Sequence, residues 1–199
     1  MKNLRQLGSW AIARASAPAA LRMLGPGQVL SALRKAKDQP ILCERTWSCG
    51  ASADLQWRQA ITGDGRVVLA DPQRPEGMLS AVLRPGRFRA EGDGLTASEL
   101  RRRYADAAPM GVDLAAADRA RLLDLAWEAR EGFVAETAAA FTPERTTLSC
   151  FVPSEDGRTF ERVLIAEEGA TELRNLHPAA EALDEWLHAL LPRPRPTLH

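Results

Sequence analysis

The sequence contains three cysteines, whose thiols could bind a metal, form a disulfide or act as nucleophiles. They are Cys43, Cys49 and Cys150. If the chain is extended between Cys43 and Cys49, the two lie roughly 20 Å apart, whereas a disulfide needs Cα atoms within about 7 Å. A zinc site would need further ligands, and the sequence has no Cys-x-x-Cys motif. We interpret the cysteines as small buried hydrophobic residues, with metal binding or redox chemistry as the alternative, and we predict no metal and no cofactor.

Two histidines stand beside residues that could give them a role. Asp184 and His188 are four residues apart in a predicted helix, which places them side by side on its surface. A carboxylate in that position can orient an imidazole as a general base, but the same spacing is typical of an exposed ion pair, which we favour. His177 precedes the helix and can cap it. Because the sequence also has no Gly-x-Ser-x-Gly motif, we predict no catalytic residue.

Two glycine-containing segments were candidates for binding a phosphate or a calcium ion. Gly63-Asp64-Gly65 lacks the spacing of a P-loop or of a dinucleotide-binding fingerprint, and a hairpin turn explains it, because glycine tolerates positive φ. Residues 91–99 are similar to the second half of an EF-hand loop, but the positions that need carboxylates fall on Arg89 and Leu100. We therefore predict no calcium site.

The N-terminal segment has the most uneven charge in the chain. Residues 1–37 carry seven basic residues and no acidic one, which leaves 19 of the 26 basic residues against all 26 acidic residues, a net charge of −7 for the rest. A basic amphipathic segment can dock on an anionic surface, and a tryptophan can anchor it there. We predict that this segment binds a partner through Lys2, Arg5, Trp10, Arg14, Arg22, Arg34, Lys35 and Lys37.

The strands that would position these residues follow from hydrophobic residues that recur every second position. We expect strands at residues 41–49, 55–61, 67–70, 78–83, 146–152 and 159–166. The last two are predicted to form a hairpin.

Helical spacing of the apolar residues predicts three helices after the first strands. Thr96 and Glu99 have the spacing of a capping box for a helix over residues 96–107. A longer helix is expected over residues 113–131, with its first residue as the cap. A final helix is expected over residues 178–191, where a proline suits the first turn.

Together these elements predict an α+β fold: an antiparallel sheet of about five or six strands, built from hairpins, with helices packed on one face. We divide the chain into a basic amphipathic helical arm at residues 1–38, a globular domain at 39–191 and a disordered Pro- and Arg-rich tail at 192–199. Hydrophobic residues make up 45% and charged residues 26% of the 199 residues, which is typical of a globular protein. No stretch approaches the roughly 20 apolar residues of a membrane-spanning helix, so we expect a soluble, cytoplasmic protein.

The pattern favours a non-enzymatic binding or accessory protein that docks on a macromolecular partner through its basic arm. No convergent catalytic set is evident, whereas the arm and the apolar hairpins offer contact surface. We expect a protein partner before an anionic membrane surface, and nucleic acid last. Two alternatives stay open: an enzyme whose site assembles only in the fold, and a peripheral membrane protein attached through residues 1–38. The sequence sets neither the identity of the partner nor the oligomeric state.

The later half of the chain shows one further pattern. Residues 114–191 run through a helix, a strand, a Gly turn, a strand and a Pro-initiated helix that ends in Asp184-Glu185-Trp186-Leu187. This order resembles the emfourin-type inhibitors of metalloproteases. We transfer no residue role and no activity from that family, because the spacing of the earlier half departs from the family's pattern.

Overall fold

The structure is a computed structural model that describes residues 39–49, 56–70, 95–139, 142–154 and 158–191. Three predictions lie outside these residues: the arm at 1–38, the strand at 78–83 and the tail at 192–199. Within the described ranges, no helix is long and apolar enough to cross a membrane.

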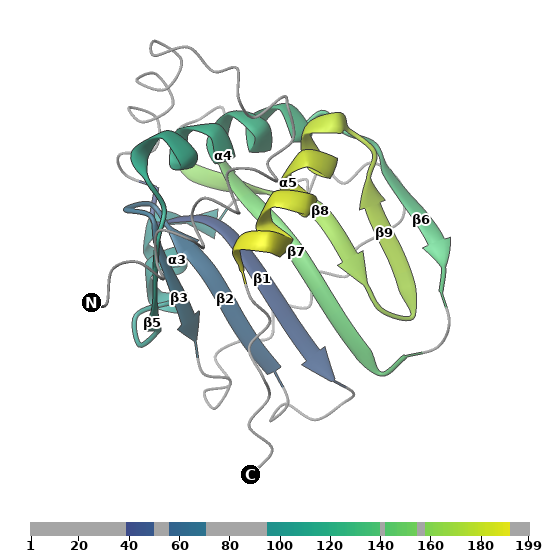
Figure 1. The fold of residues 1–199 in the computed structure, drawn as a ribbon, viewed down its shortest axis with the longest axis horizontal. Coiled ribbons are helices and arrows are strands. Elements are labelled where there is room, and N and C mark those ends of the chain that lie inside the picture. Colours follow the sequence, from purple (N-terminus) through teal and green to yellow (C-terminus); the bar gives the residue numbers. More distant parts are fainter. Residues whose placement is uncertain (1–38, 50–55, 71–94, 140–141, 155–157, 192–199) are drawn as a thin grey trace, which may run out of the picture.

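The described residues form one nine-stranded sheet in which every neighbouring pair of strands is antiparallel. Eight strands follow the order β5-β3-β2-β1-β7-β8-β9-β6, and β4 pairs with β8 (Figure 1). The strands are β1 (Ile41–Cys49), β2 (Gln56–Thr62), β3 (Arg66–Ala70), β4 (Leu95–Thr96), β5 (Ala108–Asp113), β6 (Val134–Ala138), β7 (Glu144–Pro153), β8 (Thr159–Glu168) and β9 (Thr171–Asn175). The helices are α3 (Ala97–Arg103), α4 (Ala116–Ala129) and α5 (Pro178–Leu190). The predicted α+β class with an antiparallel sheet is confirmed, but the sheet is larger than the five or six strands expected.

The additional strands are short and lie mostly toward the two ends of the sheet. β5 contains Pro109 and Gly111, which both disfavour strands, and it is tolerated because it pairs only with β3 at an edge. β6 and β9 pair with each other over five residues, and β9 also pairs with β8. Segments of this length become strands because they form hydrogen bonds with a neighbouring strand. The alternation of hydrophobic residues within the segment does not predict this pairing.

The start of α4 differs from the prediction for the same reason. Asp113, the expected cap, belongs to β5 and lies opposite Arg66 in the register with β3. The next amide, that of Leu114, donates to the carbonyl of Gly65 at 2.8 Å. Sheet pairing therefore holds this stretch extended, and the helix begins at Ala116 with Ala115 as an N-cap that makes no side-chain hydrogen bond.

The β2–β3 hairpin turns at the predicted glycines. Gly65 has φ of 94°, a conformation that glycine adopts without strain. A Cβ atom there would lie 2.7 Å from the carbonyl oxygen of Leu114, so the close approach of the two segments also requires glycine. The predicted hairpin between β7 and β8 is likewise present.

The other two helices carry the predicted start signals. At α3, the amide of Glu99 donates to Thr96 Oγ1 at 3.3 Å, and the amide of Thr96 donates to Glu99 Oε2 at 2.7 Å, which completes the capping box. The helix ends at Arg103, earlier than expected, because the chain turns there toward β5. At α5, the amide of Ala179 donates to His177 Nδ1 at 3.2 Å, so His177 is the cap.

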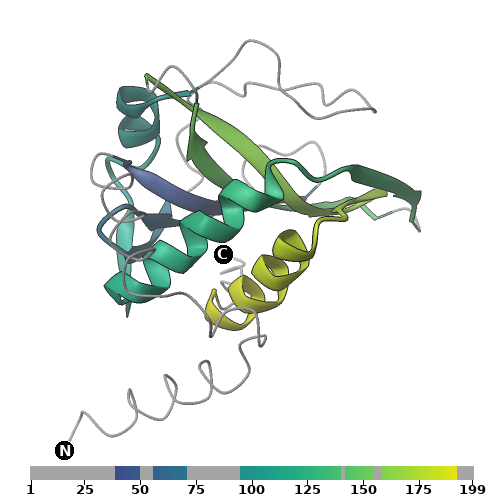
Figure 2. The same ribbon diagram turned by 90° about the horizontal axis from the view of Figure 1, so that it is seen from above.

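The helices lie on both faces of the sheet, and the prediction that they share one face is wrong. α4 and α5 cover one face, called the α5 face below, and α3 lies on the opposite face, the α3 face (Figure 2). Strand β7 shows why. Leu148, Cys150 and Val152 join the core under α4 and α5, whereas Phe151 between them joins a second core with Leu100 of α3. Because alternate residues of a strand point to opposite faces, a strand that is apolar on both faces needs cover on both.

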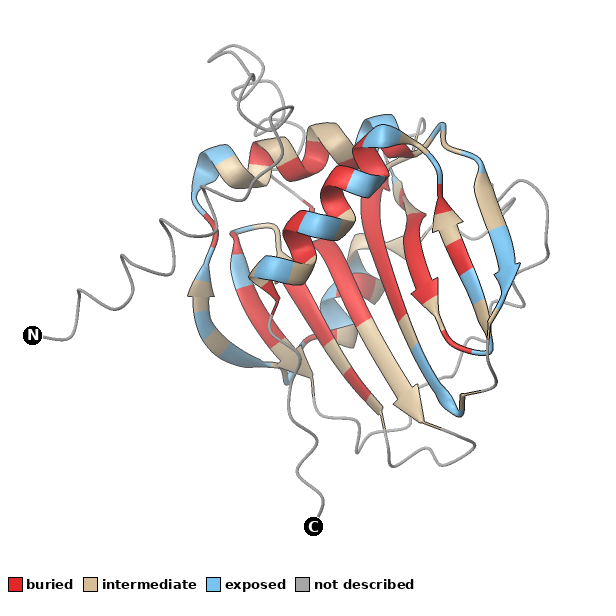
Figure 3. Ribbon diagram, turned by 45° about the vertical axis from the view of Figure 1, so that its right-hand side comes forward, coloured by how far each residue is buried: buried red, intermediate tan, exposed pale blue. Residues whose placement is uncertain are grey.

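The α5 face carries the larger core. Leu183 and Leu187 of α5 are fully buried against strand residues such as Leu148 and Ile165. Burial of a side chain of this size contributes about 1.5–3 kcal/mol. Buried residues run along the centres of the strands, whereas exposed residues gather on the outer surfaces of the helices and on β6 (Figure 3). The stability of the fold is therefore concentrated under α4 and α5.

Candidate functional site

The structure places two of the cysteines together in the core of the α5 face. Cys43 on β1 lies directly opposite Cys150 on β7, and both thiols are free and fully buried. Burial raises the pKa of Cys43 well above its usual value, and the neighbouring Cys150 raises it further. A thiol held protonated in this way is a poor nucleophile. The interpretation as buried hydrophobic residues is confirmed for Cys43 and Cys150, while Cys49 at the end of β1 is half-buried.

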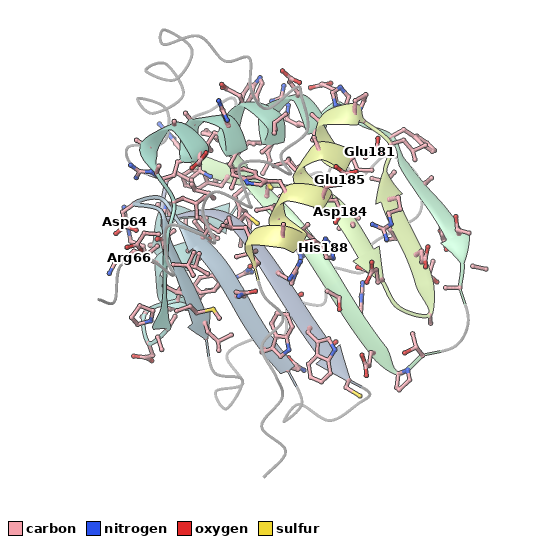
Figure 4. All side chains as sticks on the ribbon, viewed as in Figure 1. Asp64, Arg66, Glu181, Asp184, Glu185 and His188 are labelled. Atoms are coloured by element: carbon pink, nitrogen blue, oxygen red, sulfur yellow. The ribbon has the colours of Figure 1, made fainter. Side chains whose placement is uncertain are left out.

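Asp184 and His188 lie side by side on α5, as predicted (Figure 4). His188 Nδ1 is 3.0 Å from Asp184 Oδ1, and Arg174 Nη1 donates to Asp184 Oδ2 at 2.6 Å. The hydrogen bond to Asp184 raises the pKa of His188, against the opposing effect of burial. Burial alone would raise the pKa of Asp184, but His188 and Arg174 outweigh it and lower that pKa.

These charges continue into a network that suits an ion pair and not a general base. Arg174 also contacts Glu168 Oε1 at 3.0 Å, so acidic and basic side chains alternate from β8 through β9 to α5. A general base must be neutral in order to accept a proton. Since the raised pKa of His188 favours its charged form, the arrangement supports the ion-pair interpretation.

The most elaborate polar arrangement lies on the α3 face, around a carboxylate that is only 2% exposed. Tyr104 Oη donates to Glu44 Oε2 at 2.9 Å. Arg162 Nη2 lies 3.4 Å from Glu44 Oε1, and Arg103 Nη1 lies 3.8 Å from Glu44 Oε2. Arg162 Nε also donates to Ser149 Oγ at 3.0 Å. We call these five residues the Glu44 cluster.

Four elements position the Glu44 cluster. Glu44 lies in the middle of β1, opposite Ser149 on β7, which puts both side chains on the same face of the sheet. Arg162 comes from β8, opposite the residue two positions after Ser149. The last turn of α3 brings in Arg103, and Tyr104 follows as its C-cap. The Glu44 cluster therefore lies between the sheet and α3.

Electrostatics keep the tyrosine as a hydrogen-bond donor. Burial raises the pKa of Tyr104 well above its usual value, and the charge of Glu44 raises it further, while Arg58 and Arg103 act in the opposite direction. The phenol therefore stays protonated near neutral pH and can donate to the carboxylate.

A second surface feature is an exposed apolar corner where α4, β6, β9 and α5 meet. Its residues are Trp127, Phe133 and Leu176, with exposed fractions of 37%, 62% and 62%, and among the described residues these are the exposed large hydrophobic side chains. The amide of Leu176 donates to the carbonyl of Phe133 at 2.9 Å, so these two are direct neighbours. Trp127 lies on the last turns of α4, where the guanidinium of Arg130 stacks 4.2 Å from its ring centre. We call the three residues the apolar corner.

One buried side chain fixes the geometry of this corner. Asn175 Nδ2 donates to the carbonyls of Ala129 and Leu164 at 2.9 and 3.0 Å, and its Oδ1 accepts from the amide of His177 at 3.0 Å. A Cβ atom on Gly132 would lie 1.9 Å from Asn175 Oδ1, so only glycine fits there. The end of α4 is thereby held against the start of α5, and the apolar corner is presented on a rigid support.

Sequence reasoning missed both features. Glu44 shares one side of its predicted strand with Leu42, Thr46 and Ser48, and a charged residue in the middle of that strand was the available signal. Phe133 and Leu176 are large apolar residues outside the predicted elements, which is also a usable signal. The convergence of Tyr104 and Arg162 on Glu44 has no local signature, because the three residues come from distant parts of the chain.

The predicted partner-binding residues all lie outside the described residues. They are Lys2, Arg5, Trp10, Arg14, Arg22, Arg34, Lys35 and Lys37. In the part of the chain that is described, no group of three or more His, Cys, Asp or Glu side chains is placed to hold a metal ion.

Comparison of the chain with protein-family models, with curated proteins and with solved structures finds no match. The resemblance of residues 114–191 to emfourin-type inhibitors stays a prediction. Function is therefore argued from the Glu44 cluster and the apolar corner themselves.

Proposed function

We propose that this chain is a non-enzymatic accessory protein that binds a protein partner through the apolar corner. The observation that carries the proposal is the exposed pair Phe133 and Leu176, which are direct neighbours held in place by Asn175, together with the exposed Trp127 on the last turns of α4. Single exposed apolar residues are common on protein surfaces, but adjacent ones are typical of an interaction site. Aromatic residues together with an arginine are also the residues that dominate protein interfaces, and Arg130 stacks on Trp127 here.

The edge strand next to the apolar corner supports a partner that binds as an extended segment. β6 ends the strand order, and within the described ranges only β9 pairs with it. Hydrogen bonds from Leu176 to Phe133 and from Ala139 to Ala170 show which residues of this segment turn their backbone toward β9. By alternation, Val134, Glu136 and Ala138 direct their N–H and C=O groups outward. An added strand could use these groups and place an apolar side chain on the corner.

Charge along β6 favours a basic residue in that partner segment. Glu136 is exposed in the middle of the strand and has no ion-pair partner among the described residues. The edge carries neither a lysine nor a proline, the residues that commonly block strand addition. A lysine or arginine opposite Glu136 would add a favourable cross-strand pair.

The basic segment at residues 1–37 is the second element of the proposal. Its seven cations and Trp10 would contact an acidic surface of the same partner. This contact would raise the association rate and make it sensitive to salt, because exposed charges steer encounter and are screened.

Affinity capture with matched variants tests the apolar corner. The combined Phe133→Ser and Leu176→Ser variant removes two exposed apolar side chains, and Ala189→Ser changes an exposed residue near the other end of α5 as the control. We expect a stoichiometric partner with the wild type and the control, and its loss with the double variant. Thermal unfolding should show that both variants stay folded, because exposed substitutions change stability by about 0.5 kcal/mol or less.

Retention of the same partner by the folded double variant would overturn the proposed role of the corner. A chain that begins at Pro40 tests the basic segment separately. Weaker and less salt-dependent capture by this shorter chain is expected, whereas equal capture would remove the segment from the proposal.

A further inference from the structure

The α3 face gathers more positive charge than its buried carboxylate can balance. Arg103 and Arg162 contact the two oxygens of Glu44. A third arginine, Arg58 on β2, lies opposite Thr46, which is two residues after Glu44 on the same face of β1. Its charge also acts on Tyr104. We call Arg58, Arg103 and Arg162 the arginine cluster.

Among the described residues, Glu44 is the carboxylate within 4 Å of the arginine cluster. Glu44 supplies one negative charge beneath these three positive charges. Glu99, one turn before Arg103, also acts on Arg103 through its charge, while its Oε2 accepts hydrogen bonds from the amide and hydroxyl of Thr96 at 2.7 Å. Arg58 makes neither a hydrogen bond nor an ion pair with any described residue.

The guanidinium groups also make few close contacts within the described ranges. A strong charge-assisted contact between nitrogen and oxygen measures about 2.7–2.9 Å, whereas the contacts to Glu44 measure 3.4 and 3.8 Å. Each guanidinium has five N–H donors in a planar fork. Arg162 Nε donates to Ser149 Oγ and orients the guanidinium group, whose Nη2 faces Glu44 at 3.4 Å.

The arginine side chains are partly exposed, although Glu44 beneath them is buried. The side chains of Arg103 and Arg162 are 26% and 33% exposed, and Arg58 is half-buried, whereas the Glu44 side chain is 2% exposed. An anion approaching this face would meet the guanidinium groups of Arg103 and Arg162 above the buried carboxylate, with Arg58 on the same face of the sheet. Partial burial strengthens such contacts relative to those on an open surface.

We propose that Arg58, Arg103 and Arg162 form a binding site for a phosphate group. Whereas a single carboxylate offers two oxygens, a phosphate group offers three acceptor oxygens to these guanidinium groups. Its oxygens also match the arginine fork, which binds phosphate through paired hydrogen bonds. Glu44 is the positioning residue, because it holds Arg103 and Arg162 on opposite oxygens. This site lies on the α3 face and is independent of the apolar corner.

Calorimetric titration of the full chain tests the site. Inorganic phosphate and glycerol phosphate are titrated separately at constant ionic strength, with sodium chloride as the comparison. We expect saturable binding of phosphate that chloride does not reproduce. Equal affinity for the two probes would assign the site to free phosphate, and tighter binding of glycerol phosphate would assign it to a phosphate ester. The absence of saturable binding with both probes would overturn the proposal.

Matched arginine variants locate the binding. Arg58→Ala should weaken phosphate binding about tenfold or more, the equivalent of one charge-assisted contact. It should stay folded, because Arg58 holds no described partner. Arg66→Ala removes the same charge from an exposed residue that pairs with Asp64, and it should leave the affinity within about twofold. Equal losses in the two variants would show a general charge effect and would overturn the assigned site.

Discussion

The two faces of the sheet use the same strands for different purposes. Toward α4 and α5, β7 presents Leu148, Cys150 and Val152 to the larger apolar core. Arg45 and Gln59 are also buried on this face, where Arg45 Nη1 donates to the carbonyl of Leu191 at 2.6 Å. Toward α3, the same strand presents Ser149 beside the buried Glu44. Two longer helices cover the first face, whereas only the short α3 covers the second among the described elements. The comparison indicates that the α5 face carries the larger apolar core, whereas the α3 face combines a smaller apolar core with the Glu44 cluster.

Physical chemistry supports this division. Burial of apolar side chains is the main favourable term in folding. A buried ion cluster adds little net stability, because desolvation offsets much of the attraction between its charges. Net stabilisation is therefore a weak explanation for Glu44 and its arginines, which is the reason to test the proposed phosphate site.

The largest expected loss of stability comes from substitutions in the two apolar cores, one on each face of the sheet. Leu187→Ala on α5 should lower the free energy of unfolding by about 2–5 kcal/mol, because it leaves a cavity in the larger core. Leu100→Ala on α3 removes an equally buried leucine from the smaller core, and its loss should lie at the lower end of that range because a short helix can relax. Urea unfolding of both variants measures the difference. Equal losses would remove the distinction between the faces.

Glu44→Gln should cause the next largest loss of stability. The amide keeps the shape of the side chain and can accept from Tyr104, but it no longer attracts Arg103 and Arg162. We expect a loss of about 2–3 kcal/mol, since partly buried positive charges lose their partner. Glu185→Gln, an exposed change on α5, is the control and should stay within about 0.5 kcal/mol. The same small effect from both variants would contradict the importance of the buried carboxylate.

Tyr104→Phe sharpens the comparison within the α3 face. It removes one hydrogen bond to a charged group and should lower the free energy of unfolding in urea by about 1.5 kcal/mol.

Tyr104 is the single tyrosine of the chain, so its ionisation can also be followed directly by ultraviolet absorbance. Because burial and the charge of Glu44 raise its pKa, the folded protein should show little tyrosinate at pH 10, where an unfolded chain shows about half. Half ionisation in the folded state would contradict the buried donor.

The smallest effect concerns the α5 network and depends on pH. The raised pKa of His188 adds stability that is fully present below its unfolded value of about 6.5 and is lost as pH rises through the folded pKa. The lowered pKa of Asp184 adds stability that is present above about pH 3.9 and is lost as pH falls through its folded pKa.

The His188→Gln variant measures this contribution. It should be less stable than the wild type by under about 1 kcal/mol at pH 5, because the pair is partly exposed, and equally stable at pH 9. Unfolding by urea at the two pH values gives the difference. A deficit that grows toward pH 9 would have the wrong sign for an ion pair with charged His188.

Several elements were predictable because their causes lie within a few residues. The capping box at Thr96 and the glycine turn at Gly65 depend on local hydrogen bonds and on φ. The β7–β8 hairpin and α5 follow from hydrophobic spacing. The side-by-side placement of Asp184 and His188 follows from helix geometry alone.

Other elements depended on neighbours far away in the chain. β5, β6 and β9 have weak strand patterns and exist because adjacent strands satisfy their backbone groups. The placement of α3 opposite α4 and α5 could not be read from any single helix. It follows from strands that are apolar on both faces.

The sequence by itself determined the class of the fold, the turns, the helix caps and the amphipathic helices, because these follow from local geometry and from the period of the hydrophobic pattern. Only the tertiary structure decided which side chains meet. Pairing of β1 with β7 joins the two halves of the chain and brings Glu44 beside Ser149, and the arrival of α3 adds Tyr104. Contacts between such distant residues depend on strand order and register, and no local pattern encodes them.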